Sequence, residues 1–265
     1  MLRNVAYKIG RKLYFWARKE TPNSPEENGE FALLSHVLSE TAGPATVLDV
    51  GANRGEWSRK AVSLARANRL DVCVHAFEPL SGTRALLEKG VAELPEVRVH
   101  SVALSNAPGT AAFYSQSAGS GTSSLHPVSG NRAEDVKLAT LDAWIADQQC
   151  TPVRMIKIDV EGFDSLVLEG AARTLQEGLV DVVQFEYNWR WLLNSRSLHW
   201  VFQFIEDKPY IFGKVVPDGV ITFERWHFEL DRFFEGNYLL LRRDSAVAQL
   251  GRPAWFDQSN VLRLA

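Results

Sequence analysis

The stretch TVLDVGANRG, residues 46–55, decides the fold of this chain. An apolar run ends at Asp49 and Val50, Gly51 follows at once, and an amphipathic helical pattern begins just after Gly55. This succession of strand, glycine turn and helix is typical of open α/β sheets, where the turn exposes backbone N–H groups and a helix N-terminus to a nucleotide-like ligand. It predicts a binding site outside the carboxyl ends of parallel strands.

Strand and helix patterns alternate downstream of this stretch. Strands are predicted at residues 46–50, 71–77, 97–103, 153–159 and 180–186. The helices between them are predicted at residues 56–68, 81–90, 141–147 and 163–176. Two further strand pairs are predicted at 110–114 with 136–140, and at 210–216 with 237–242. The pattern predicts βαβ units in a Rossmann-like, doubly wound α/β sheet, whose edge the last pair closes as an antiparallel pair.

Length and composition suit one domain with extensions, since the 265 residues are 46% hydrophobic. We divide the chain into an N-terminal helical extension (1–43), a main domain (44–245) and a C-terminal tail (246–265). The formal net charge of −3 argues against a broad nucleic-acid-binding surface. Cys73 and Cys150 lack metal-ligand spacing, which favours reduced thiols in the cytoplasm. No apolar run is long enough for a transmembrane helix.

Residues 1–20 form a basic amphipathic pattern. Apolar side chains such as Val5, Ile9 and Leu13 recur at helical spacing, and six lysines and arginines lie between them. Such a helix can lie peripherally on an anionic membrane or on a partner protein. The alternative is an ordinary helix that packs on the domain with its cations in water.

Polar residues end the first two strands, and a small apolar segment ends the third. A carboxylate at the position of Glu78 accepts both hydroxyls of a ribose, and Ala103 and Leu104 offer apolar contacts to an adenine. A dinucleotide site requires a second glycine where this chain has Asn53, whose side chain obstructs a pyrophosphate. A P-loop motif is absent from the sequence. The pattern favours S-adenosylmethionine, which has no phosphate, with Asp49 orienting the turn or holding a charged cofactor group.

The segments in this order resemble the FkbM-family methyltransferases, a branch of the class I S-adenosylmethionine-dependent enzymes. The matching segments are DVGANRG (49–55), HAFEP (75–79), VALS (102–105), TLD (140–142), IKIDVEG (156–162) and VLEGA (167–171). The resemblance implies a seven-stranded class I methyltransferase sheet with a terminal antiparallel strand. It also implies that Gly51 and Asn53 lie near the methionine tail of the cofactor and Glu78 on its ribose. Members typically O-methylate sugar hydroxyls of glycans or glycosides, or polyketide-type products.

The segment IKIDVEG is the strongest candidate for the reaction centre. Strand alternation places Lys157 and Asp159 on one face, and Glu161 is expected to begin the next helix. In one hypothesis, Asp159 or Glu161 is the general base for a substrate hydroxyl. In the other, Asp159 and Glu186 hold a divalent metal ion, by analogy with catechol-type methyltransferases. The structural alternative is a buried pair of Lys157 with Asp159 and a helix-capping Glu161.

Further residues are candidates for contacts with a small-molecule or glycan substrate. Glu186, Asn188 and Trp189 follow the fifth strand, and Trp189 is suited to stacking on a sugar ring. Ser124 and His126 lie in a loop rich in serine and glycine, where His126 is a candidate base or substrate contact. The other hypotheses are a methyltransferase that acts on a nitrogen or a carboxylate, and a nucleoside-binding module without catalysis.

Overall fold

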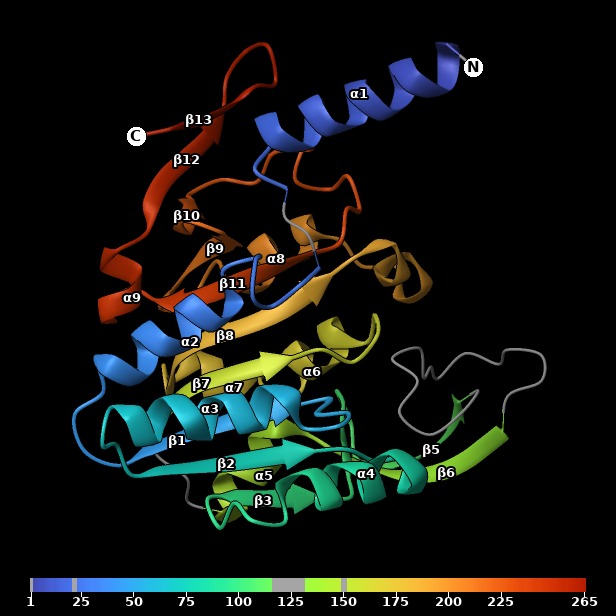
Figure 1. Ribbon diagram of the computed structural model, residues 1–265, viewed down its shortest axis with the longest axis vertical. Coiled ribbons are helices and arrows are strands. Elements are labelled where there is room, and N and C mark those ends of the chain that lie inside the picture. Colours follow the sequence, from blue (N-terminus) through green and yellow to red (C-terminus); the bar gives the residue numbers. More distant parts are fainter. Residues whose placement is uncertain (1, 21–22, 116–131, 149–151) are drawn as a thin grey trace.

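The computed structural model describes residues 2–20, 23–115, 132–148 and 152–265 (Figure 1). Its helices are α1 (Leu2–Ala17), α2 (Glu30–Ser39), α3 (Glu56–Ala67), α4 (Ser81–Val91), α5 (Leu141–Gln148), α6 (Asp164–Glu169), α7 (Ala172–Gln176), the 3₁₀ helix η1 (Trp189–Asn194), α8 (Leu198–Phe204) and α9 (Ala246–Gln249). Its strands are β1 (Ala45–Val50), β2 (Val72–Phe77), β3 (Val97–His100), β4 (Ala103–Leu104), β5 (Gly109–Ser115), β6 (Arg132–Ala139), β7 (Val153–Ile158), β8 (Val180–Tyr187), β9 (Tyr210–Val216), β10 (Gly219–Phe223), β11 (Gly236–Arg242), β12 (Arg252–Phe256) and β13 (Leu262–Leu264).

A single large sheet forms the centre of the molecule, in the order β13-β12-β10-β9-β11-β8-β7-β1-β2-β3. Strands β3, β2, β1, β7 and β8 are parallel, and β11 runs antiparallel between β8 and β9 (Figure 1). The chain leaves β1 for β2 on one side and returns later to β7 on the other, so β1 lies at a topological switch point. The predicted α/β class with a mostly parallel sheet is confirmed.

The far edge of the sheet differs from the prediction. Strands β9 and β11 pair antiparallel as expected, but they do not close the sheet. After β9, a turn at Pro217 and Asp218 brings β10 back as an antiparallel neighbour of β9, and β12 then pairs with β10 and β13 with β12. The described sheet therefore has three strands more than the seven that the sequence predicts. Strands β10, β12 and β13 add to it in turn and provide hydrogen-bond partners for the backbone at the edge of β9.

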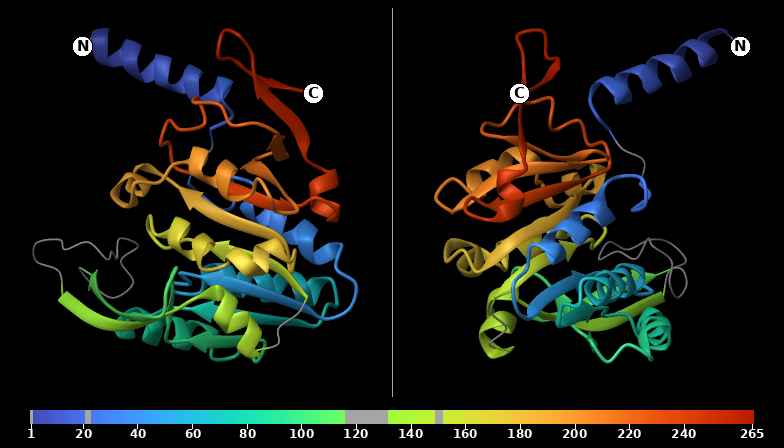
Figure 2. Two further views of the ribbon diagram at one scale, coloured as in Figure 1. Left: turned by 180° about the vertical axis from the view of Figure 1, so that it is seen from behind. Right: turned by 60° about the vertical axis from the view of Figure 1, so that its left-hand side comes forward.

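Two helical layers bury the two faces of the sheet (Figures 1 and 2). Alternation along β1 directs Val47 toward the layer with α2 and α3, and Leu48 toward the layer with α5, α6, α7 and α8. Both side chains are fully buried, as is usual for a central parallel strand. This packing holds the carboxyl ends of β1, β7 and β8 rigidly side by side, where the candidate site lies.

A small second sheet, in the order β4-β6-β5, lies beside these strand ends. The predicted hairpin is confirmed, since β5 and β6 pair antiparallel from Gly109 with Leu138 onward. The strand predicted at 97–103 is divided, however, because Ala103 and Leu104 leave the large sheet and pair with β6. This departure carries both residues over the end of β2.

The helix predicted at residues 163–176 is two short helices, α6 and α7, separated at Gly170 and Ala171. A Cβ atom at Gly170 would lie 2.1 Å from the carbonyl oxygen of Ser105. The close approach of these backbones explains the glycine. The helix also begins at Asp164 rather than at Glu161, which adopts a left-handed conformation with φ of 57°.

Helix α1 contacts the domain near its C-terminal end, where Tyr14 and Phe15 pack against Phe234. None of its side chains is buried, and the helix projects from one end of the molecule (Figures 1 and 2). The contact expected of an ordinary packed helix is therefore seen in its last turn but not along its length. Within the part of the chain that the structure describes, we find no helix long and apolar enough to span a bilayer.

Candidate functional site

The predicted polar residues converge at the carboxyl ends of four neighbouring strands. Asp49 lies near the end of β1, Glu78 directly follows β2, Asp159 directly follows β7, and Glu186 is the second-to-last residue of β8. The register confirms the neighbourhood, since Asp49 pairs with Lys157 across β1 and β7. The site therefore lies where open α/β sheets bind ligands.

The turn after β1 requires glycine. Gly51 has φ of 85°, and a Cβ atom there would lie 1.9 Å from the carbonyl oxygen of Asp159. Asn53 also has positive φ, 47°, which asparagine tolerates better than most residues. Gly55 precedes α3 and provides no side-chain cap for it. The N–H groups of Gly51 and Ala52 donate to the carbonyl oxygen of Phe77 over 3.1 and 3.0 Å, which fixes the turn to the end of β2.

An apolar pocket opens between this turn and the small sheet. Its lining includes Gly51, Asn53, Glu78, Ala103, Leu104, Phe77, Phe113, Asp159 and Glu161. Five of the six residues predicted to contact the cofactor are therefore brought together. The sixth, Asp49, is fully buried beneath the turn, where it accepts a hydrogen bond of 2.6 Å from the hydroxyl of Ser58. Its geometry suits it to holding the turn against α3.

Glu78 is the buried acid of the apolar pocket. Its Oε1 accepts a hydrogen bond of 3.0 Å from the backbone N–H of Leu80. Burial raises the pKa of Glu78 to about 7, although hydrogen bonds from the backbone oppose the shift. Hydrogen bonds from the hydroxyls of a ligand would stabilise a carboxylate in this position, because few water molecules remain to solvate it.

A polar cleft adjoins the apolar pocket on the other side of the glycine turn. It is lined by charged and amide side chains that include Glu30, Lys157, Glu186 and Asn237. The cleft and the apolar pocket share Gly51, Asn53, Asp159 and Glu161. These four residues therefore form the boundary at which two ligands would meet.

Lys157 is the central cation of this boundary. Its Nζ lies 3.1 Å from Oδ2 of Asp159 and 3.9 Å from Oδ1 of Asp49. Burial opposes the charge of Lys157, but Asp159, Asp49 and Glu30 together raise its pKa above the usual value. The predicted pair of Lys157 and Asp159 is present, and Lys157 remains a cation that neutralises the acids around it.

Glu161 is held in an uncommon conformation at the same boundary. A left-handed non-glycine residue costs about 1–3 kcal/mol and is most frequent at functional sites. Oε2 of Glu161 lies 3.1 Å from Nη1 of Arg190. Burial and the nearby charge of Asp159 raise the pKa of Glu161 to about 7, against the opposing effect of Arg190. The side chain is thus poised to exchange a proton near neutral pH.

The three candidates at the end of β8 have different surroundings. Glu186 lines the polar cleft and is nearly buried, which raises its pKa. Asn188 is buried and caps η1: its Oδ1 accepts from the N–H of Arg190, and its Nδ2 donates to Glu186 over 2.8 Å. Trp189 is exposed, and Arg190 stacks on its ring. Asn188 therefore acts through Glu186 and η1 rather than from the surface. Ser124 and His126 lie outside the described residues.

Two residues of the polar cleft escaped the sequence analysis. Glu30 begins α2 and is buried, with its Oε1 unpaired and its Oε2 3.2 Å from Nδ2 of Asn237. Asn237 pairs directly with Glu186 across β11 and β8. No local pattern marks either residue, because a contact over 207 positions arises only when β11 inserts beside β8.

The metal hypothesis requires a set of ligands. Within residues 2–20, 23–115, 132–148 and 152–265, no group of three His, Cys, Asp or Glu side chains is arranged to hold a metal ion. The ammonium of Lys157 instead lies where a cation would neutralise Asp159. A metal at Asp159 and Glu186 stays a hypothesis, and we assign it no step.

Comparisons with known proteins identify the family. The family described as methyltransferase FkbM domain matches residues 49–212, more than half of the chain. Similar solved structures include a methyltransferase FkbM from Methylobacillus flagellatus KT (16% identity, TM-score 0.45, 76% of this chain and 45% of that chain). Another is M. capricolum TrmK in complex with S-adenosyl-homocysteine, with 10% identity, a TM-score of 0.42 and coverage of 79% of this chain and 67% of that chain. A SAM-dependent methyltransferase from Agrobacterium tumefaciens has 9% identity, a TM-score of 0.46 and coverage of 83% of this chain and 63% of that chain.

These structural similarities are distant, and the chain spans less than half the length of the Methylobacillus protein. No curated protein sequence matches it. The family match is the stronger finding, because it runs from the glycine turn through all four strand ends of the site to β9. The chain therefore belongs to the FkbM methyltransferase family.

Proposed function

We propose that this protein transfers a methyl group from S-adenosylmethionine to a hydroxyl on a sugar of a glycan, glycoside or related metabolite. One observation carries the proposal: an apolar pocket and a polar cleft meet at Asp159 and Glu161. A methyl transfer needs this arrangement, since donor and acceptor must come together in line at one point. Family membership supports the same reaction class.

The residues of the apolar pocket fit S-adenosylmethionine. Glu78 would hold the ribose hydroxyls, Ala103 and Leu104 would flank the adenine, and the turn at Gly51 and Asn53 would face the methionine tail. Buried Glu78 matches two hydroxyl donors, and the apolar lining matches a purine ring. When bound, the cofactor supplies an electrophilic methyl group on a sulfonium.

Glu78→Gln is expected to weaken the affinity for S-adenosylmethionine by about 10- to 100-fold, the value of hydrogen bonds to a charged group. Because the pKa of Glu78 is about 7 in the free protein, the wild-type affinity should rise between pH 6 and pH 8 as the carboxyl ionises. Calorimetric titration at both pH values measures both effects. The exposed Glu93→Gln variant is the control, and equal affinity of Glu78→Gln and wild type would contradict the assignment.

Glu161 is the general base in this proposal. The proton of a substrate hydroxyl would pass to a carboxylate oxygen of Glu161 as the hydroxyl oxygen takes up the methyl group, which S-adenosylmethionine held in the apolar pocket would supply. A pKa of about 7 makes Glu161 a stronger base than an ordinary carboxylate and leaves it ionised above neutral pH. Lys157 positions Asp159 beside the reacting atoms.

The polar cleft supports a sugar as the acceptor. Glu30, Glu186 and Asn237 offer carboxylate and amide groups, the side chains that most readily bond to several hydroxyls at once. Exposed Trp189 precedes Arg190, which pairs with Glu161, and its ring is suited to stacking on a sugar. Ser124 and His126 stay predicted substrate contacts. Acceptors with a nitrogen, a carboxylate or a polyketide hydroxyl are the competing outcomes.

Turnover is expected to survive removal of divalent metal ions. Lys157 lies 3.1 Å from Asp159 and supplies the positive charge that a metal would otherwise provide. The measurement is the methylation rate after treatment with excess EDTA, with magnesium added back as the control. A loss above tenfold that magnesium restores would revive the hypothesis of a metal at Asp159 and Glu186.

Calorimetric titration with S-adenosylmethionine, with NAD as control, is the first test. Micromolar binding of S-adenosylmethionine alone supports the pocket. Mass spectrometry of glycoside, polyketide, amine and RNA acceptors then identifies the product, and we expect a mass gain of one methylene on a glycoside and none on RNA. Binding without turnover on any acceptor would favour the alternative of a nucleoside-binding module, and binding of neither ligand would overturn the proposal.

A further inference from the structure

Helix α1 has an apolar face without a partner in the molecule. Successive residues of an α-helix are rotated by about 100°, so Leu2, Val5, Ile9, Leu13 and Trp16 share one stripe. All five are exposed, Leu2 and Trp16 by 88% and 79%. An exposed apolar stripe of this length is typical of a surface that binds a partner or a membrane.

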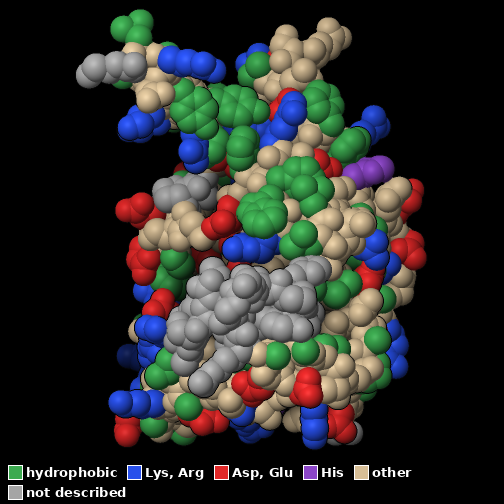
Figure 3. Space-filling model, turned by 90° about the vertical axis from the view of Figure 1, so that its right-hand side faces the viewer, with side chains coloured by type: hydrophobic (Ala, Val, Ile, Leu, Met, Phe, Trp, Pro, Cys, Tyr) green, Lys and Arg blue, Asp and Glu red, His purple; other side chains and the backbone are tan. Residues whose placement is uncertain are grey.

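The charges of this segment have one sign. Residues 2–19 contain six lysines and arginines and no acidic side chain, although the whole chain has a formal net charge of −3. Figure 3 shows hydrophobic and basic side chains close together on the projecting helix. A positively charged amphipathic helix is complementary to an anionic surface with an apolar layer beneath it.

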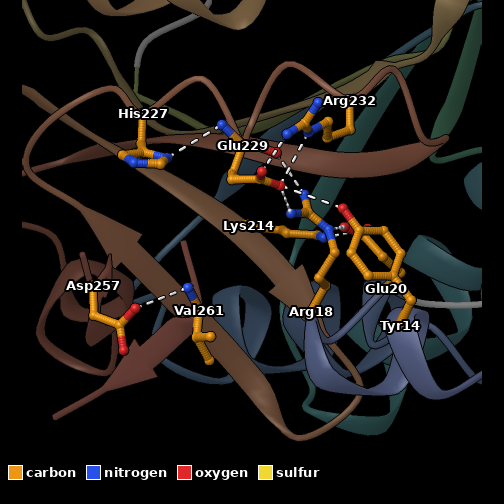
Figure 4. Close-up of polar contacts among 9 residues, drawn as sticks. All are labelled: Tyr14, Arg18, Glu20, Lys214, His227, Glu229, Arg232, Asp257 and Val261. Atoms are coloured by element: carbon orange, nitrogen blue, oxygen red, sulfur yellow. Dashed lines mark hydrogen bonds and ion pairs between the residues drawn. The ribbon is translucent and has the colours of Figure 1, made fainter. Parts of the chain in front are cut away.

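The base of α1 is fixed to the domain by buried ion pairs (Figure 4). Arg18 donates to Oε2 and to the carbonyl oxygen of Glu229, each over 2.5 Å, and its Nε donates to Glu20. Lys214 on β9 donates to the other oxygen of Glu20 over 2.5 Å, and Tyr14 donates to Glu229. Such buried pairs resist separation, because either charge alone would be unsolvated. Helix α1 is therefore held at a set orientation instead of on a free tether.

The contacts at the base also determine which way the apolar stripe points. Tyr14 and Phe15 pack edge-on against Phe234, with ring centroids 6.0 and 4.8 Å apart. At about 100° per residue, Tyr14, Phe15 and Arg18 centre on a direction about 180° from that of Ile9, Leu13 and Trp16. The side of the helix that contacts the domain is opposite to its apolar side.

A second apolar element projects from the same end of the molecule. The hairpin of β12 and β13 rises beside the base of α1 (Figures 1 and 2), and Phe256 of β12 lies under the guanidinium of Arg18. Trp255 and Val261 of this hairpin are exposed. Tryptophans on two elements at one end suit the interface between lipid headgroups and acyl chains, where amphipathic rings are enriched.

We propose that α1 lies in the surface of an anionic lipid bilayer, with its apolar stripe among the acyl chains and its cations among the headgroups. A second copy of the chain fits less well, because two such helices would bring cations together with no acidic residue between positions 2 and 19 to neutralise them. The membrane would hold the enzyme by the end that carries α1 and leave the carboxyl edge of the sheet accessible.

Vesicle co-sedimentation of the full chain tests this proposal. We expect pelleting with vesicles of phosphatidylcholine containing 30% phosphatidylglycerol, and at least tenfold weaker pelleting with phosphatidylcholine alone. Ile9→Ser with Leu13→Ser should weaken binding by more than tenfold, and Lys8→Gln with Lys12→Gln by roughly 25-fold, since each cation near an anionic surface contributes about fivefold. Leu250→Ser, an equally exposed leucine on the domain, is the matched control and should bind like the wild type.

Fluorescence quenching by brominated lipid gives a second readout. Quenching should be lost in large part in Trp16→Phe, which leaves every buried contact of the domain in place. Equal pelleting of wild type and the Ile9→Ser, Leu13→Ser variant would overturn the proposal. So would sedimentation velocity in which the wild type is a dimer that this variant dissociates while neither protein binds vesicles, because the stripe would then be an interface between copies.

Discussion

Replacing Glu161 by glutamine is expected to lower kcat by about 10²- to 10⁴-fold, the usual contribution of a positioned general base. Glutamine keeps the shape of the side chain and its contact with Arg190 but cannot accept the proton. The wild-type kcat/KM should rise with pH and level off above about 7, the pKa of Glu161. The variant should lose this inflection. Stopped assays from pH 5.5 to 9 with saturating cofactor measure both, with Glu93→Gln as the control.

Stability separates loss of catalysis from loss of folding in this variant. The pKa of Glu161 is higher in the folded protein than its usual 4.5, so ionisation destabilises the fold as the pH rises from about 4.5 to about 7. At pH 8 the neutral glutamine removes this penalty, and Glu161→Gln should unfold at the same temperature as the wild type or higher. Full activity in Glu161→Gln with a loss above 100-fold in Asp159→Asn would reassign the base to Asp159.

Replacing Lys157 by methionine is expected to lower the free energy of unfolding by about 3–5 kcal/mol, as for other buried ion pairs that lose one partner. Methionine fills a similar volume, so the loss is electrostatic. Asp49 is fully buried, with Oδ1 only 3.9 Å from the ammonium, and would keep an uncompensated charge. Urea unfolding followed by circular dichroism measures the change, with the exposed Lys89→Met as the control.

The pH dependence of this loss provides a further check. Burial already raises the pKa of Asp49, and Lys157 opposes the shift. Without Lys157 the pKa should rise further above the unfolded value, so that stability is best retained at low pH and falls as the pH rises. The deficit of Lys157→Met should therefore be larger at pH 8 than at pH 5. A deficit below about 1 kcal/mol at both pH values would show that Lys157 is not required to balance the buried acids.

Local sequence patterns singled out several residues that the structure brings together in the apolar pocket. The turn at Gly51 and Asn53, the acid at Glu78 and the apolar pair at Ala103 and Leu104 all line one pocket. Each of these positions follows a strand of a parallel sheet, and parallel strands bring their carboxyl ends to one edge whatever lies between them. A period-two or helical pattern is enough to find such positions.

The polar cleft depends on contacts that no local pattern records. Glu161 was expected to begin a helix, yet the close approach of Gly51 to the backbone of Asp159 directs the chain through a left-handed turn first. Glu30 and Asn237 meet only because β11 inserts between β8 and β9. These features arise from strand order, which spacing along the chain does not determine.

The sequence by itself determined the α/β class, the place of the pocket and the chemistry of the residues at the strand ends, because hydrophobic periodicity and glycine geometry act over a few neighbouring residues. Only the tertiary structure decided that Lys157 also lies beside buried Asp49, and that β10, β12 and β13 extend the sheet. It also decided which side of α1 faces away from the domain, through the ion pairs of Arg18 with Glu229. Such outcomes depend on packing between segments about 200 residues apart, where burial and charge pairing choose among arrangements that are equally compatible with the local pattern.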